Sequence, residues 1–204
     1  MPTLRLAHAV AIAPARGSGQ DRAQVFEVGD DLIIALADGA GGTASGATAA
    51  HAIIDAVGAA VTAPPDWCAL LSELDRDPRR LGRGQSTAVI VSISAGAISG
   101  TSVGDSGAWL LRSTDIVELT EGQHRKPFVG DGCIPVRIWP MTLGDDTLLV
   151  ASDGLLRYAK RTDILRIASG PDLCTAVHAL IDLVRLRNGT LQDDVAIVLC
   201  RALR

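Results

Sequence analysis

Aspartates stand at the ends of several apolar segments, and these residues have the type and spacing that could do chemistry. The segment "LIIALADGAGG" (32–42) runs into Asp38 and three glycines, and "TLLVASDGLL" (147–156) repeats the pattern at Asp153. Asp105 follows a glycine in "SVGDSGAW", and the pair Asp193-Asp194 directly precedes the last apolar segment. A carboxylate at the end of a buried segment is costly unless something positive meets it.

Two interpretations of these aspartates remain open at this point. Asp-Gly is an ordinary turn sequence at strand ends, so each pair alone is consistent with a turn. Taken together, strand ends on one rim of a sheet can bring several carboxylates to one place. Mg²⁺ and Mn²⁺ prefer carboxylate and carbonyl oxygens with water, and glycine after an aspartate leaves room for both. Such a site could polarise phosphoryl oxygens and activate water.

The elements that must position these residues are mainly strands. Helices are predicted over 45–61, 66–74, 162–168 and 171–187, the longest two from apolar residues spaced three and four apart. Strands are predicted near the N-terminus and over 30–38, 87–94, 97–103, 107–113, 115–120, 147–153 and 195–201. The four strands between 87 and 120 are expected to form an antiparallel meander. Strands in a run with long helices outside it predict one α+β domain over 1–204.

Composition excludes some classes of function. The chain has 204 residues, 48% of them hydrophobic, and a net charge of −4, which argues against a general nucleic-acid binder. No apolar run is long enough for a membrane span, and the N-terminal stretch is interrupted by charge, so it predicts a strand rather than a signal peptide. The four cysteines, Cys68, Cys133, Cys174 and Cys200, are widely spaced, which favours a reducing cytoplasm over a disulfide framework or a zinc site.

Six blocks in order resemble the metal-dependent protein phosphatases of the 2C type, and the resemblance covers nearly the whole chain. The blocks are "RGSGQDRAQV", "ADGAGGTASG", "GQSTAVIV", "VGDSGAWLL", "LLVASDGLL" and "QDDVAIVL". The resemblance implies a four-layer αββα sandwich of two antiparallel sheets flanked by helices, with two Mg²⁺ or Mn²⁺ ions at one edge. The short stretch between Asp153 and Asp193 offers no insertion for a flap subdomain, so a compact, bacterial-like form is expected.

The resemblance also assigns roles to particular residues. It implies metal ligands at Asp38, at the backbone carbonyl of Gly39, and at Asp153 and Asp193. It implies a phosphate-binding arginine at Arg16, whose guanidinium fork suits phosphate oxygens. Possible outer-shell or third-metal positions are Asp21, Asp105 and Asp194.

The implied function is hydrolysis of phosphoserine and phosphothreonine in proteins. A water bridging the two metals would attack phosphorus without a phosphoenzyme, while the metals and Arg16 stabilise the developing charge. Arg16 and the metal ligand Asp38 are therefore the residues expected to be catalytic. The expected partner is a phosphorylated protein, opposite a serine/threonine kinase. A cytoplasmic monomer that binds neither nucleic acid nor membrane is expected.

Departures from the family pattern define further expectations. The asparagine often found before the Gln/Glu-Asp pair is Gly19, and the histidine of eukaryotic members, a proposed general acid, is Ala40. His124 stands where relatives often have an Asp-His pair. Many relatives bind a third cation between the aspartate matching Asp105 and a second one, which here is Arg157. We therefore expect Arg157 to pair with Asp105 and to oppose a third metal.

Two alternative functions remain. A degenerate phosphatase fold could bind phosphoproteins or a signalling partner with little catalysis, which the changes at Gly19 and Ala40 would allow. A dinucleotide-binding enzyme is the other, since "GAGGTA" (39–44) satisfies a relaxed glycine-rich pattern between a strand and a helix.

Overall fold

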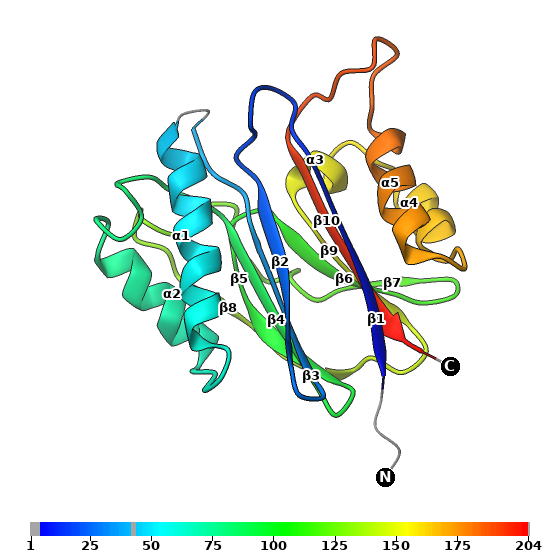
Figure 1. Ribbon diagram of the computed structural model, residues 1–204, viewed down its shortest axis with the longest axis horizontal. Helices are drawn as coiled ribbons and strands as arrows, with labels where there is room; N and C mark the ends of the chain where they lie inside the picture. Colours follow the sequence, from blue (N-terminus) through cyan, green and yellow to red (C-terminus); the bar gives the residue numbers. More distant parts are fainter. Residues whose placement is uncertain (1–4, 42–43, 204) are drawn as a thin grey trace.

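Two five-stranded antiparallel sheets lie face to face at the centre of the computed structural model, which describes residues 5–41 and 44–203 (Figure 1). The first sheet has the order β1 (Leu6–Ala13), β10 (Val195–Ala202), β9 (Thr147–Ala151), β6 (Gly107–Leu111) and β7 (Ile116–Glu118). The second has the order β2 (Arg22–Val28), β3 (Asp31–Ala37), β4 (Ala88–Ser94), β5 (Ala97–Val103) and β8 (Val136–Thr142).

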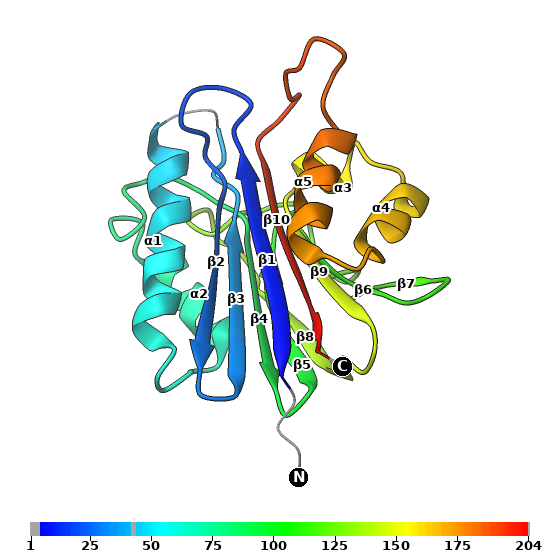
Figure 2. The same ribbon diagram turned by 45° about the vertical axis from the view of Figure 1, so that its right-hand side comes forward.

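Helices cover the outer face of each sheet (Figure 2). The second sheet is covered by α1 (Ala44–Ala60) and α2 (Trp67–Arg76). The first is covered by α3 (Asp153–Leu156), α4 (Arg161–Ala168) and α5 (Leu173–Leu183). The predicted α+β class and four-layer sandwich are therefore confirmed, and residues 153–193 hold only the helical layer of the first sheet, as expected of a compact form.

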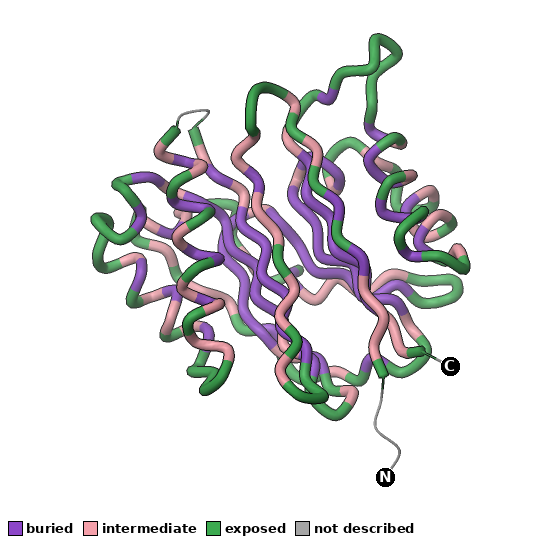
Figure 3. Tube along the Cα trace, viewed as in Figure 1, coloured by how far each residue is buried: buried purple, intermediate pink, exposed green. Residues whose placement is uncertain are grey.

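Three hydrophobic cores separate the four layers, which explains why the central strands are continuous apolar runs. In β3, Ile34 and Leu36 face the other sheet, whereas Ile33 and Ala35 face the helices. The buried trace through the centre of Figure 3 follows these strands. A strand buried on both faces has no polar side to alternate with, so its sequence lacks the period of two.

The predicted helices are all present, and two of them begin at an aspartate cap. Asp66 accepts a hydrogen bond from Cys68 N at the start of α2, and Asp172 accepts one from Thr175 N at the start of α5. Such caps satisfy amide groups that the first helical turn leaves without partners. Cap residues thus set the starts of α2 and α5, within two residues of the predicted starts.

The predicted meander of four strands is wrong in one respect. β4 pairs with β5 and β6 pairs with β7, but β5 and β6 belong to different sheets. The chain crosses from one sheet to the other at Gly104–Ser106, with Gly104 at a positive φ of 96°. The crossing places Asp105 between the two sheets rather than in a hairpin turn.

Strands β2 and β8 were not predicted. β2 carries mixed polar and apolar residues, and β8 contains Pro140 and an exposed Trp139. Both lie at the edges of the second sheet, where proline and exposed side chains are tolerated because one side of the strand has no hydrogen-bonded neighbour.

The strand register brings all the predicted aspartates to one rim. Ala37, at the end of β3, pairs with Arg22, and Ala151, at the end of β9, pairs with Ile197 near the start of β10. Val103, at the end of β5, pairs with Ala88 at the start of β4. None of the helices in the described ranges is long and apolar enough to cross a bilayer.

Candidate metal centre

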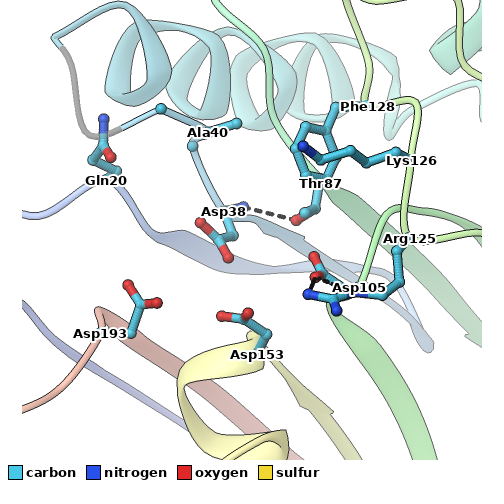
Figure 4. A pocket seen from close by; sticks show the side chains of 12 residues that line it. Gln20, Asp38, Ala40, Thr87, Asp105, Arg125, Lys126, Phe128, Asp153 and Asp193 are labelled. Carbon is cyan, nitrogen blue, oxygen red and sulfur yellow. Dashed lines mark hydrogen bonds and ion pairs between the residues drawn. The ribbon is translucent and has the colours of Figure 1, made fainter.

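A pocket of about 730 Å³ opens at the rim where these strands end (Figure 4). Asp38, Asp153 and Asp193 come from three different segments and point toward the same space. The other lining residues are Gln20, Gly39, Ala40, Gly41, Thr87, Asp105, Arg125, Lys126 and Phe128. The fold therefore gathers residues that are up to 173 positions apart in the sequence, from Gln20 to Asp193.

The backbone of Asp38 is held at the floor of the pocket. Its amide donates to Thr87 Oγ1 at 3.0 Å, and its carbonyl accepts from Thr87 N and from Ser86 Oγ, both at 2.8 Å. Thr87 Oγ1 lies 2.7 Å from Ser106 Oγ, so the network reaches the segment that carries Asp105. Because backbone groups make these bonds, the Asp38 carboxylate is left to face the pocket.

The glycines after two of the aspartates are required by packing. A Cβ at Gly39 would lie 2.4 Å from the Gly46 carbonyl group, because α1 packs directly against this turn. A Cβ at Gly154 would lie 1.9 Å from the Asp194 carbonyl oxygen. The close approach at Gly154 is what brings Asp153 next to Asp193.

Ser152 fastens the same junction from inside. Its amide donates to the Ala196 carbonyl at 3.0 Å, and its hydroxyl accepts from Ala196 N at 2.9 Å. Ser152 is fully buried, so these bonds are shielded from water. The end of β9 and the start of β10 are therefore held together immediately beside the carboxylates.

The carboxylates of the pocket strongly disfavour carrying their charges together without a cation. Burial, followed by repulsion from Asp21 and Asp153, raises the pKa of Asp38 to about 10. Burial, with Asp105 and Asp193 nearby, raises the pKa of Asp153 to about 6. A bound cation would reverse both effects by favouring the ionised carboxylates.

Asp21 gives the clearest sign that positive charge belongs here. It is 1% exposed, and neither of its carboxylate oxygens makes a hydrogen bond of good geometry within the described residues. Burial raises its pKa to about 7 although the nearby Ser152 hydroxyl acts to lower it, and the charge of Asp194 adds to the rise. A buried carboxylate that lies near Asp38, Asp193 and Asp194 suits a site that holds divalent cations.

The protein side chains alone do not complete the coordination sphere. Within 5–41 and 44–203, no group of three His, Cys, Asp or Glu side chains has the geometry of a metal site. Mg²⁺ and Mn²⁺ accept backbone carbonyls and keep several waters, so a sparse set of carboxylates around an open pocket fits them better than it fits zinc.

Arg16 and Asp194 lie in an adjoining hollow rather than in the metal pocket. This hollow, of about 610 Å³, shares Gln20 and Asp193 with the pocket, and Arg16 is exposed on it. The two carboxylate oxygens of Asp194 accept from Ala15 N at 2.7 Å and from Gln20 N. Asp194 thus holds the loop that carries Arg16.

The predicted pairing of Asp105 with Arg157 is wrong. Arg125 meets it with two hydrogen bonds, from Nε at 3.0 Å and from Nη2 at 2.8 Å. Arg157 lies instead near the Tyr158 ring, 5.7 Å from the ring centroid. Asp105 does meet a guanidinium, but one from the loop between β7 and β8.

Sequence reasoning missed Arg125, Lys126 and Phe128, which line the pocket. The sequence signal for them is the cationic run "RKPF" directly after His124, which itself does not line the pocket. The dinucleotide interpretation of 39–44 is also wrong, because the strand before it pairs antiparallel with β4 and no parallel βαβ unit is formed by the described strands. Gly42 and Thr43 of that motif lie outside the described residues.

Comparison with solved structures identifies the architecture. The Streptococcus agalactiae serine/threonine phosphatase matches with a TM-score of 0.83 at 22% identity, over 98% of this chain and 100% of that one. The catalytic domain of the serine/threonine protein phosphatase PstP, solved with two manganese ions, matches with a TM-score of 0.77 at 22% identity, over 99% and 100%. This chain has their fold. Stp1 from Staphylococcus aureus is similar at 18% identity, with a TM-score of 0.76 over 98% of this chain and 95% of that chain. No protein-family model and no curated protein matches the chain by sequence.

Proposed function

We propose that the protein is a Mg²⁺- or Mn²⁺-dependent serine/threonine protein phosphatase of the 2C type. The observation that carries the proposal is the convergence of Asp38, Asp153 and Asp193 on one pocket, with the buried Asp21 next to Asp38. The solved structures of the same fold add support, since they are serine/threonine phosphatases and one holds two manganese ions. The substrate would be a phosphorylated protein in the cytoplasm, opposite a serine/threonine kinase.

Each residue has a proposed task. The carboxylates of Asp38, Asp153 and Asp193 and the carbonyl of Gly39 would hold two divalent cations. Metal ions bound there would polarise the phosphoryl oxygens and lower the pKa of water, so that it can attack phosphorus. Thr87 and Ser86 keep Asp38 at the pocket floor through its backbone, so its carboxylate needs little reorganisation to bind.

Other residues would act at the margins of the pocket. Arg16 would contact the phosphate, or the peptide that flanks it, from the adjoining hollow. Asp194 would position the Arg16 loop, and Asp105 would anchor Arg125. Because Ala40 has no group that can donate a proton, the proton for the leaving serine or threonine oxygen must come from elsewhere in the pocket.

A direct test is hydrolysis of p-nitrophenyl phosphate and of a phosphothreonine peptide by the purified protein. We expect turnover of both with Mn²⁺ or Mg²⁺ and its loss with excess EDTA. The phosphoprotein-binding alternative instead predicts peptide binding without turnover in any metal. Turnover that persists in EDTA would contradict the proposal.

A further inference from the structure

Hydrogen bonds hold both ends of the segment Arg125–Val129 beside the metal pocket. At one end Arg125 makes its two hydrogen bonds to Asp105. At the other, Val129 and Ser86 exchange backbone hydrogen bonds at 3.0 and 3.2 Å. Ser86 also donates its hydroxyl to the Asp38 carbonyl at 2.8 Å. The position of this segment is therefore fixed relative to Asp38.

Lys126 lies in the middle of this fastened segment. Its side chain runs across the Phe128 ring, with the ammonium 5.5 Å from the ring centroid and on the side of Asp38 and Ala40 (Figure 4). Both Lys126 and Phe128 line the metal pocket. A cation–π contact of this kind restricts the ammonium without neutralising its charge.

The charge of Lys126 is not used by the protein itself. In the described part of the chain, no carboxylate lies within ion-pair distance of its ammonium, whereas Arg125 beside it is paired with Asp105. Arg125 balances Asp105, and two divalent cations would balance Asp38, Asp153, Asp193 and the buried Asp21. The positive charge that remains suits a phosphomonoester dianion.

We propose that Lys126 binds the phosphoryl group of the substrate inside the metal pocket. The inference rests on the proposed phosphatase function and adds to it a phosphate-binding residue from the loop between β7 and β8. Lysine is a compact charge with three rotatable donors, so it can follow phosphoryl oxygens as they move during in-line displacement. Arg125 would act as a positioning residue, because its guanidinium is engaged by Asp105 and fixes the segment.

Binding of inorganic phosphate to the Mg²⁺-loaded protein, measured by isothermal titration calorimetry, tests the role without requiring turnover. A charged hydrogen bond of ordinary strength predicts that Lys126→Met weakens phosphate binding about ten- to hundredfold. Lys126→Arg should restore most of the affinity. Lys160→Met, at an exposed lysine before α4, is the matched control and should bind as the wild type does. Unchanged phosphate affinity in Lys126→Met would overturn the proposal.

Kinetics separate phosphate binding from proton donation. If Lys126 binds phosphate, Lys126→Met lowers kcat/KM to a similar extent for p-nitrophenyl phosphate and for a phosphothreonine peptide. p-Nitrophenolate leaves readily without a proton, so a loss confined to the peptide would instead make Lys126 a proton donor or a peptide contact and overturn the proposal.

The two proposals can fail separately. A wild type that turns over both substrates while Lys126→Met matches it in every measurement leaves the phosphatase function standing and removes Lys126. If the wild type binds phosphate through Lys126 but turns over neither substrate, the phosphate-binding role of Lys126 stands and the phosphatase function fails. Melting temperatures of all variants should agree with the wild type, because Lys126 is exposed.

Discussion

The metal pocket and the adjoining hollow each combine an anchoring aspartate with a cationic side chain, but the aspartate binds a different kind of group in each. In the metal pocket, Asp105 anchors the loop between β7 and β8 through the guanidinium of Arg125, which leaves Lys126 with an unpaired charge. In the adjoining hollow, Asp194 anchors the loop before β2 through two backbone amides, which leaves the guanidinium of Arg16 exposed. An aspartate beside the pocket can thus be a structural anchor, and the partner that it takes decides which cationic side chain is left without an ion pair among the described residues.

Removing a carboxylate from the metal pocket should have the largest effect. We expect Asp153→Asn to lower kcat/KM by about three orders of magnitude or more, since metal binding contributes several kcal/mol to transition-state stabilisation. The measurement is Mn²⁺-dependent hydrolysis, together with Mn²⁺ affinity by calorimetry. Asp163→Asn on α4, where the carboxylate faces Arg166, is the control and should keep wild-type activity. Wild-type activity in Asp153→Asn would remove the metal pocket from the mechanism.

Removing the hydrogen bonds of Asp194 to the loop that carries Arg16 should mainly lower the stability of the protein. Asp194→Asn loses one of the two carboxylate acceptors for Ala15 N and Gln20 N, so a partly buried amide is left without a partner. The expected loss is about 1–3 kcal/mol in the free energy of unfolding, measured by urea denaturation. Asp182→Asn, at an exposed pair with Arg185, should change it by less than about 0.5 kcal/mol. If both variants unfold alike, Asp194 does not anchor the loop.

The phosphate affinities of Arg16→Met and Lys126→Met compare the contributions of the two cationic side chains to phosphate binding. Arg16 is exposed on the adjoining hollow, from which we propose that it contacts phosphate. We therefore expect the phosphate affinity of Arg16→Met to fall about threefold, less than that of Lys126→Met. Calorimetry with inorganic phosphate under identical Mg²⁺ conditions gives both numbers. A larger loss in Arg16→Met would mean that its side chain enters the metal pocket when phosphate is bound.

Alkylation of the cysteine thiols should not affect activity. Burial raises the pKa of Cys200 to about 12, and burial with Asp75 nearby does the same for Cys133, so neither thiol is ionised at neutral pH. The exposed Cys174 lies on α5, outside both hollows, and should react without consequence. We expect phosphatase activity to be unchanged after iodoacetamide treatment, with modification followed by mass spectrometry. Inactivation at a rate that matches labelling of any one cysteine would contradict a water nucleophile.

The sequence by itself determined the four longer helices and the buried strands, with ends within a few residues of those observed, but not the short helix α3. Apolar runs such as Leu32–Ala37 must be buried wherever they pack, and an aspartate after such a run must stand at a rim. These signals are local, because they depend on the hydrophobicity and periodicity of neighbouring residues. The edge strands β2 and β8 were not predicted, because exposed edge strands show neither a continuous apolar run nor a clear period.

Only the tertiary structure decided which sheet each strand joins and which cation meets each carboxylate. No local pattern distinguishes a hairpin between β5 and β6 from a crossing between sheets, because the same glycine-rich turn serves both. Asp105 pairs with Arg125 rather than Arg157 because the loop after β7 folds back over the rim, where Ser86 and Val129 fix it. The backbone hydrogen bonds between Ser86 and Val129 thus bring Arg125 within reach of Asp105, and the ion pair then adds to the hold on the loop.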